Sequence, residues 1–89
     1  MEVKMNREAR ADFNSLDPQV QIAAIEEARK LKRWPDVSGV KHLEGRWAGH
    51  ARLKVRKDWR LVFRILTAKA RLVIVRIGHR SVVYDNPPK

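Results

Sequence analysis

A run of basic side chains at alternating positions is the first feature of this sequence that suggests chemistry. Arg52, Lys54 and Arg56 alternate with apolar residues, a period of two that is typical of a β-strand with one cationic face. Neighbouring cations on that face would lie about 6.5–7 Å apart, similar to the phosphate spacing along a single nucleic-acid strand. Arg60 and Arg64 extend this surface if the next strand pairs beside the first. The pattern predicts a surface that binds a polyanion.

The net charge of the chain is concentrated in the same region. The 89 residues include 20 Lys and Arg against 10 Asp and Glu, a formal net charge of +10. Residues 46–80 carry 11 basic side chains and 1 acidic one, whereas each flanking segment is neutral. Such a concentration favours a nucleic acid as partner, with binding that weakens steeply as salt rises. The alternative is a basic face that only keeps the protein soluble.

The residue types argue against several classes of site. There are no cysteines, which excludes disulfide scaffolds, zinc ribbons and thiol catalysis. His42, His50 and His79 are far apart in the sequence and have no supporting acids, so we expect no metal site and no cofactor. Asp58 is the single acidic side chain within residues 46–80, which argues against a carboxylate base there.

The length and hydropathy pattern predict a single domain that spans residues 1–89. A chain of this length builds one compact core, which excludes a two-domain enzyme with a deep cofactor cleft. The apolar runs are far shorter than the roughly 20 residues that cross a bilayer, and the N-terminus lacks the form of a signal peptide. We therefore expect a soluble, cytoplasmic protein without membrane contacts.

The elements that must position the basic residues are two helices followed by three strands. Asn6 and Asp17 are the expected N-caps of helices over 7–15 and 18–33, and Pro35 ends the second. Strands are expected over 51–56, 59–66 and 71–77, with connections short enough for antiparallel pairing. A leading strand over 2–5 is permitted but not required. The prediction is an α+β domain, a small antiparallel β-sheet packed against two N-terminal α-helices.

Two segments carry a resemblance to a known family. They are Arg-Leu-Lys-Val-Arg-Lys-Asp-Trp-Arg-Leu-Val-Phe-Arg at 52–64 and Val-Arg-Ile-Gly-His-Arg-Ser-Val-Val-Tyr at 75–84. Together with the two leading helices, they resemble the RelE/ParE superfamily of toxins from type II toxin–antitoxin systems, over the whole chain. The family fold is a small antiparallel sheet on two N-terminal helices, which agrees with the architecture expected from the pattern.

In the RelE branch, this resemblance implies a ribosome-dependent endoribonuclease that cleaves mRNA in the ribosomal A site without a metal ion. The positions that match the family's catalytic residues are Lys54, Arg60, Arg80 and Tyr84, with His79 just before the second arginine. Arg52, Arg56 and Arg64 are the expected RNA-binding residues beside them. The domain is therefore expected to be a single RelE-like toxin domain.

The chemistry of such a cleavage assigns a role to each group. The 2′-oxygen attacks the adjacent phosphorus, which requires a proton acceptor, stabilisation of the phosphoryl charge and a proton donor. Lys54 is the expected acceptor if neighbouring cations disfavour its ammonium form, and Arg60 suits bidentate contact with the phosphate. Tyr84 can stack on a base. Arg80 is a poor acid and is expected to stabilise charge, which leaves His79 as a second candidate for donor or acceptor.

The resemblance also implies partners and leaves alternatives open. An acidic antitoxin is the expected protein partner, in a hetero-oligomer, beside the ribosome and its mRNA. The ParE branch shares the fold but poisons DNA gyrase and is not a nuclease. The combination of Lys54, Arg60 and Arg80 with Tyr84 favours the RelE branch, since a gyrase poison does not need these groups together. A non-catalytic basic RNA-binding module is the third possibility.

Overall fold

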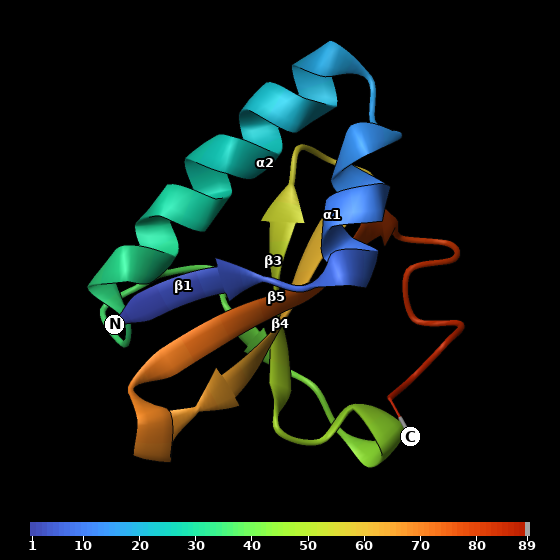
Figure 1. Cartoon of the computed structure of the whole chain (residues 1–89). Helices are drawn as coiled ribbons and strands as arrows, with labels where there is room; N and C mark the ends of the chain where they lie inside the picture. Colours follow the sequence, from blue (N-terminus) through green and yellow to red (C-terminus); the bar gives the residue numbers. More distant parts are fainter. Residues whose placement is uncertain (89) are drawn as a thin grey trace.

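Two helices cover one face of a five-stranded sheet in the computed structural model, which describes residues 1–88 (Figure 1). The helices are α1 (Arg7–Asn14) and α2 (Pro18–Lys30), and the 3₁₀ turn η1 (Leu31–Arg33) extends the second. The strands are β1 (Glu2–Met5), β2 (Lys41–His42), β3 (His50–Val55), β4 (Trp59–Leu66) and β5 (Arg71–His79). Two further 3₁₀ turns are η2 (Gly45–Trp47) and η3 (Thr67–Lys69). The predicted α+β architecture is confirmed.

The helices begin and end where the capping residues predict. The Asn6 side chain accepts a hydrogen bond from the Ala9 amide at 2.8 Å, which satisfies one free amide of the first turn of α1. Asp17 occupies the N-cap of α2, but its side chain makes no capping hydrogen bond. The following Pro18 lacks an amide hydrogen and begins the helix without losing a bond.

The sheet order is β1-β5-β4-β3-β2, and the predicted antiparallel pairs β3–β4 and β4–β5 are both present. The sheet as a whole is mixed, because β1 lies parallel to β5 at one edge. The α1–α2 hairpin separates β1 from β2 in the chain, and β1 pairs with β5 at the edge of the sheet (Figure 1). At the opposite edge, the two-residue β2 pairs with the first half of β3. The sequence pattern does not predict β2.

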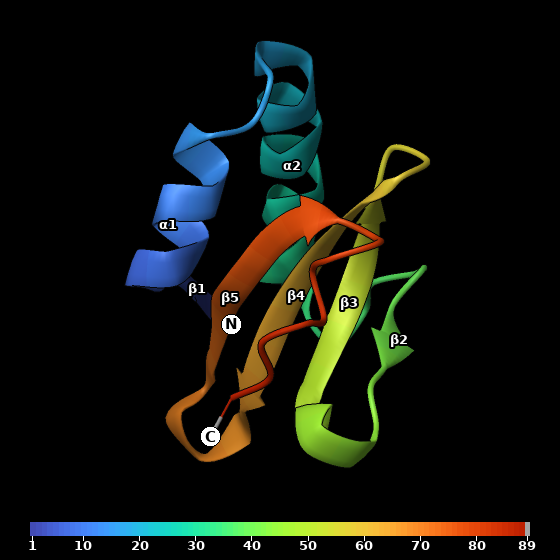
Figure 2. The same cartoon turned by 90° about the vertical axis from the view of Figure 1, so that its right-hand side faces the viewer.

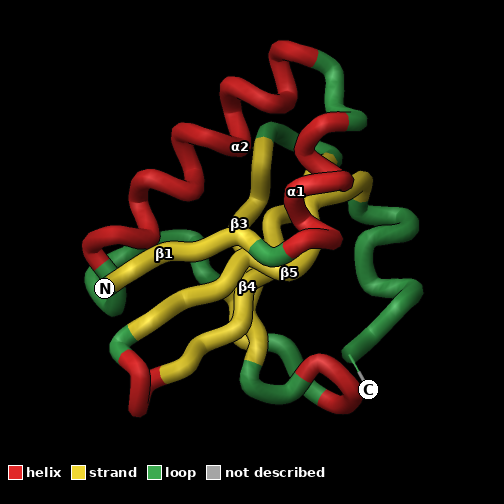
Figure 3. The backbone as a smooth tube through the Cα atoms, viewed as in Figure 1, coloured by secondary structure: helices red, strands yellow, loops and turns green. Residues whose placement is uncertain are grey.

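The sheet has an apolar core on each face. The face toward the helices contains the larger core, which includes Leu53, Leu61, Phe63 and Ile74. We call the opposite side the open face; its core is smaller and contains Trp47, Val62 and Val83. Residues 80–88 follow β5 without forming a helix or strand; they cross in front of this face in Figure 2 and run as a loop beside the sheet in Figure 3. Both faces of β5 are therefore covered, with Ile74 in the helix-side core and Val75 packed against the smaller one.

An irregularity in β5 lets the strand serve both cores. Phe63 pairs with Ile74 and Val62 pairs with Arg76, so Val75 is left without a partner residue on β4. Because this extra residue changes the alternation, Ile74 and Ile77 both reach the helix-side core although they are three positions apart.

Candidate nucleic-acid interface

Lys54 and Arg60 form the centre of the predicted site, and the sheet places them directly side by side. They are register partners in the β3–β4 pair, and they alternate with Leu53 and Leu61, which face the helices. Both therefore point to the open face, where residues directly opposite have Cβ atoms about 4.5–5.5 Å apart. Lys54 is exposed, whereas Arg60 is partly buried.

Two carbonyl groups at the β3–β4 turn hold the Arg60 guanidinium. Its Nη1 donates to the carbonyl oxygens of Lys57 and Trp59 at 3.0 and 2.8 Å. These bonds leave Nε and Nη2 available for a phosphate, and they keep the side chain in one place before any ligand binds.

Arg80 lies at the same turn. Its backbone amide donates to the Asp58 carbonyl at 2.8 Å, and its Nε is 3.6 Å from the Asp58 carboxylate. The Arg80 side chain is 60% exposed, so the ion pair is open to solvent and contributes little to stability. Four residues match the family's catalytic positions, and the structure gathers three of them, Lys54, Arg60 and Arg80, at one end of the sheet.

Tyr84 lies on the open face, but its contacts are with Trp47. The indole Nε1 of Trp47 donates to the Tyr84 carbonyl at 3.3 Å, and the two rings meet edge to face with centroids 6.1 Å apart. Trp47 precedes β3 in the chain and packs with Val62 and Val83 on the open face. The tyrosine shares the open face with the basic residues: it packs against this cluster, in which Val83 lies beside Gly78, the register partner of Arg60.

His79 is at the same end as Arg80 but belongs to the other side of the sheet. It pairs with Trp59, whose own register partner Val55 is in the helix-side core. The His79 ring contacts Trp59 edge to face with centroids 5.4 Å apart, and its Nδ1 lies 2.7 Å from the Ser81 hydroxyl. The structure does not bring His79 onto the face that Lys54 and Arg60 share.

The three predicted RNA-binding arginines go to three different places. Arg52 lies two residues before Lys54, and both line a surface pocket of about 520 Å³ beside β2. Arg64 is farther along the open face, opposite His50. Arg56 leaves the strand, because the chain turns there with φ at +56°, and its Nη1 donates to the Gln19 side chain of α2 at 3.2 Å. The expectation that Arg52, Lys54 and Arg56 share one face is therefore wrong for Arg56.

Two residues on the open face carry no functional prediction from the sequence. Trp47 supports Tyr84, and His50 lies beside it with ring centroids 5.3 Å apart. A signal for His50 exists in the sequence, because it is two residues before Arg52 and so falls on the same side of the strand. No comparable signal marks Trp47, whose position depends on the tail.

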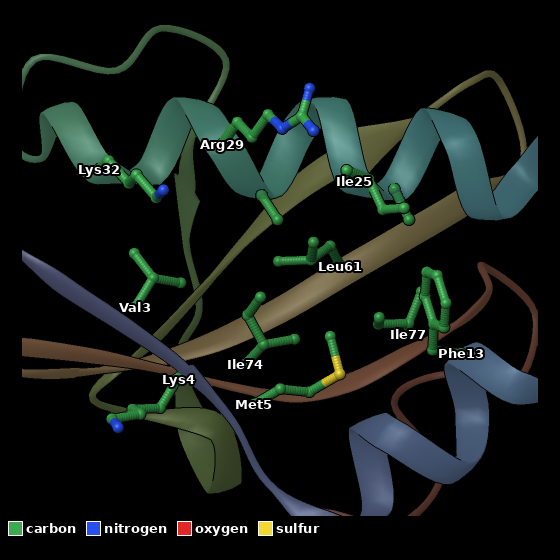
Figure 4. A pocket seen from close by; sticks show the side chains of 12 residues that line it. Val3, Lys4, Met5, Phe13, Ile25, Arg29, Lys32, Leu61, Ile74 and Ile77 are labelled. Atoms are coloured by element: carbon green, nitrogen blue, oxygen red, sulfur yellow. The ribbon is translucent and has the colours of Figure 1, made fainter.

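A separate apolar pocket of about 230 Å³ lies between α2 and β1 on the helix side (Figure 4). Its walls include Val3, Met5, Phe13 and Ile25, and Ile25 is 40% exposed. Three basic side chains belong to the same lining, namely Lys4, Arg29 and Lys32. Ile22, one turn before Ile25 on α2, is also exposed.

The described part of the chain, residues 1–88, contains no group of three or more His, Cys, Asp or Glu side chains that could hold a metal ion. None of its helices is both long enough and apolar enough to cross a bilayer. The interface built by Lys54, Arg60 and Arg80 consists of cations that can bind a phosphate and stabilise charge on it.

Comparison with known proteins finds a family and several related structures. A family model described as the ParE toxin of the type II toxin–antitoxin system parDE matches residues 3–84. The chain is similar to the toxin–antitoxin complex RelBE2 from Mycobacterium tuberculosis, with 32% identity, a TM-score of 0.76 and coverage of 89% of this chain and 96% of that chain. No curated protein sequence matches.

Two further structures share the fold at lower identity. A YoeB/ParE toxin from Agrobacterium tumefaciens is 20% identical, with a TM-score of 0.75 and coverage of 89% of this chain and 98% of that one. The isolated E. coli RelE toxin is 16% identical, with a TM-score of 0.74 and coverage of 88% and 82%. At these identities the likeness concerns the fold alone.

Proposed function

The chain belongs to the RelE/ParE superfamily of toxins from type II toxin–antitoxin systems, and from that premise we propose that it is a ribosome-dependent endoribonuclease. It cleaves mRNA in the ribosomal A site and so inhibits translation. The observation that carries this proposal is the direct pairing of Lys54 with Arg60 on the open face, with Arg80 tethered to the adjoining turn. Three cations in this arrangement suit one scissile phosphate.

The proposed reaction is attack of the ribose 2′-oxygen on the adjacent phosphorus. The new bond from the 2′-oxygen to phosphorus forms as the bond to the 5′-oxygen breaks, which leaves a 2′,3′-cyclic phosphate. The departing 5′-oxygen takes a proton from solvent water and becomes a free 5′-hydroxyl. Lys54 accepts the 2′-hydroxyl proton, and Arg60, already oriented by two carbonyl groups, binds the phosphoryl oxygens. Arg80 adds charge stabilisation.

Tyr84 and His79 have secondary parts in this proposal. Tyr84 stacks on a base and holds the RNA strand along the open face, in the position that Trp47 gives it. His79 points to the face of the sheet opposite Arg60, so the RNA must wrap around the end of β5 before His79 replaces solvent as the proton donor. Arg52 and Arg64 bind flanking phosphates on the same face as Lys54.

The alternative function is a ParE-like DNA gyrase poison. The match of the ParE toxin model to residues 3–84 favours it. A gyrase poison does not need a lysine and an arginine paired on one face, so the two functions predict different consequences for their replacement.

Cleavage during translation distinguishes the two functions. Purified ribosomes that translate a defined mRNA are incubated with the protein, and breaks are mapped by primer extension, with the message lacking ribosomes as a parallel sample. We expect A-site breaks only with ribosomes, and a loss of about 10²–10⁴ in rate for Lys54→Ala if that lysine is the proton acceptor. Arg56→Ala is the matched control, because Arg56 is a cation on the same segment that faces α2. Intact message together with trapped double-strand breaks in a DNA gyrase assay would support the alternative.

We also propose an acidic antitoxin as the protein partner. The apolar pocket between α2 and β1 suits an amphipathic segment, because aliphatic side chains line its floor while Lys4, Arg29 and Lys32 offer charge to acidic flanking residues (Figure 4). This pocket and the open face are on opposite sides of the sheet.

Isothermal titration with the antitoxin from the neighbouring reading frame tests this surface. Ile25→Glu places a carboxylate in the pocket, and we expect it to weaken binding by at least tenfold, equivalent to about 1.4 kcal/mol. Val82→Glu is the control, because Val82 is an exposed aliphatic residue in the tail at 55% exposure. Equal affinity of Ile25→Glu and the unmodified protein would exclude the pocket as the docking surface.

A further inference from the structure

The open face has a second pocket, at the end remote from Lys54 and Arg60. It has a volume of about 370 Å³, within the range of small-molecule sites. Its walls come from the start of β3, the end of β4, the bulged part of β5, the start of α1 and the tail. The lining includes Trp47, His50, Arg64, Glu8 and Asn86. None of the roles proposed for cleavage uses the imidazole or the carboxylate in this lining.

His50 is a polar side chain buried without a full set of partners. The residue is 5% exposed, and its Nδ1 lies 3.2 Å from the Ala48 carbonyl oxygen. A carbonyl oxygen only accepts hydrogen bonds, so Nδ1 carries the proton in the neutral ring and Nε2 is left as an acceptor. Trp47 fixes the ring plane, since the two rings are perpendicular.

His50 lines this pocket, and its Nε2 is the ring atom left for a ligand there. Within residues 1–88 it makes no hydrogen bond, yet no side-chain nitrogen or oxygen that is fully buried there lacks a partner. Nε2 therefore retains some contact with solvent, and His50 lines the pocket that can supply it. An acceptor in this position can take a hydrogen bond from a ligand that brings an N–H or O–H group.

Arg64 provides the charged half of the site. It is exposed, it is the register partner of His50, and within the described residues its side chain forms neither a hydrogen bond nor an ion pair. Arg76 also lines the pocket, but Asp12 binds its guanidinium through two hydrogen bonds. Arg64 is thus the cation of the lining that is free to bind an anion.

The opposite charge in the lining restricts what the pocket can hold. Glu8 is the one carboxylate among the lining residues, and it disfavours a simple anion that would fill the whole volume. A ligand with an anionic end and a hydrogen-bond-donating end satisfies both Arg64 and the acceptors His50 and Glu8. A ribonucleotide has this composition, with phosphate at one end and ribose hydroxyl and base N–H groups at the other.

We propose that this pocket binds one ribonucleotide of an RNA strand, with its phosphate on Arg64 and a ribose or base donor on His50 Nε2. The inference rests on the proposed function and adds a subsite to it. The His50–Arg64 pair is four residues along both strands from the Lys54–Arg60 pair, a separation of about 13 Å at the rise of a β-strand. The nucleotide in the pocket therefore flanks the cleaved bond, and the Tyr84 ring meets Trp47, which lines the pocket.

Titration of the full-length protein with free nucleotides tests the subsite without requiring cleavage. The probes are 5′-AMP, 5′-GMP, 5′-CMP and 5′-UMP, with inorganic phosphate as a separate titrant, and the readout is the NMR signal of the His50 ring in ¹⁵N-labelled protein. We expect a saturable shift of His50 Nε2 with at least one nucleotide. Arg64→Ala should weaken that nucleotide by about tenfold or more, because a charge-assisted phosphate contact is lost.

Matched variants separate recognition from folding. His50→Phe removes the acceptor and keeps a planar ring against Trp47, so we expect weaker nucleotide binding with an unchanged circular dichroism spectrum. Arg56→Ala is the control, because this cation faces α2, and it should leave nucleotide affinity within twofold. If His50→Phe does not fold, the nucleotide affinity of Arg64→Ala tests the subsite, because the Arg64 side chain is exposed and its removal leaves the fold intact.

Two results would overturn the subsite. One is an equal shift of His50 with inorganic phosphate alone, which would reduce the pocket to an anion site without nucleotide recognition. The other is a His50 signal that no nucleotide moves, even while ribosome-dependent cleavage persists. Failure of the proposed function is distinct, since it would appear as absent cleavage with nucleotide binding intact.

Discussion

The attachment of α1 to β5 through Asp12 supports a quantitative prediction about stability. The Asp12 carboxylate accepts hydrogen bonds from Arg76 Nε at 2.9 Å, from Arg76 Nη2 at 3.3 Å and from the Ile77 amide at 3.0 Å. The two side chains are 18% and 29% exposed, so solvent replaces these contacts poorly. β1 ends at Met5, opposite Ile74, so the Ile77 amide of β5 lies beyond the strand pairing and donates to this carboxylate instead.

Asp12→Ala should lower the free energy of unfolding by about 3 kcal/mol. Removal of one partner from a buried ion pair costs roughly 3–5 kcal/mol, and we take the lower end because Arg76 retains some contact with solvent. That estimate includes the unpaired Ile77 amide, worth about 1 kcal/mol. At about 4–8 °C for each kcal/mol in a domain of this size, Tm should fall by about 12–24 °C.

Urea denaturation followed by circular dichroism measures this change, with Asp17→Ala as the control. Asp17 is also an aspartate of the helical hairpin, at the N-cap of α2, but the Asp17 side chain makes no capping hydrogen bond. Its removal should therefore alter the free energy of unfolding by no more than about 0.5 kcal/mol. Combining Asp12→Ala with Arg76→Met should reveal a coupling energy of at least about 1 kcal/mol. A loss below about 1 kcal/mol for Asp12→Ala would refute the reasoning, because the three hydrogen bonds would then contribute nothing beyond a surface contact.

Three further predictions concern the cap of α1, the support of Tyr84 and the basic face. Asn6→Ala should cost about 1 kcal/mol in thermal unfolding, because the bond to the Ala9 amide is lost, whereas Asn6→Asp should keep most of it. Trp47→Phe removes the donor to the Tyr84 carbonyl but keeps a ring, so cleavage should slow while Tm changes by less than about 8 °C; an unchanged rate would show that this bond does not position the tyrosine. Arg64→Ala should reduce the slope of log affinity against log salt for single-stranded RNA by about 0.7 in fluorescence anisotropy, and Arg56→Ala should leave that slope unchanged.

Local patterns in the sequence were sufficient for the helices, the three long strands and the faces of β3 and β4. A cap such as Asn6 acts within one turn of its own helix, and alternation along a strand decides the side on which each residue lies. Lys54 could therefore be assigned to one face of β3 and Arg60 to one face of β4, whereas their meeting on a common surface depended on the pairing of the two strands. The two sequence motifs likewise led to the correct family.

Only the tertiary structure decided which distant segments meet. The parallel place of β1, the short strand β2 and the path of residues 80–88 depend on contacts between residues far apart in the chain, which no local periodicity encodes. The same holds for Arg56, which the β3–β4 turn directs toward Gln19, and for His79, which the register of β5 places beside Trp59. A strand pattern specifies a side chain's face but not its neighbours, because the neighbours are chosen by strand order, register and the packing of the tail.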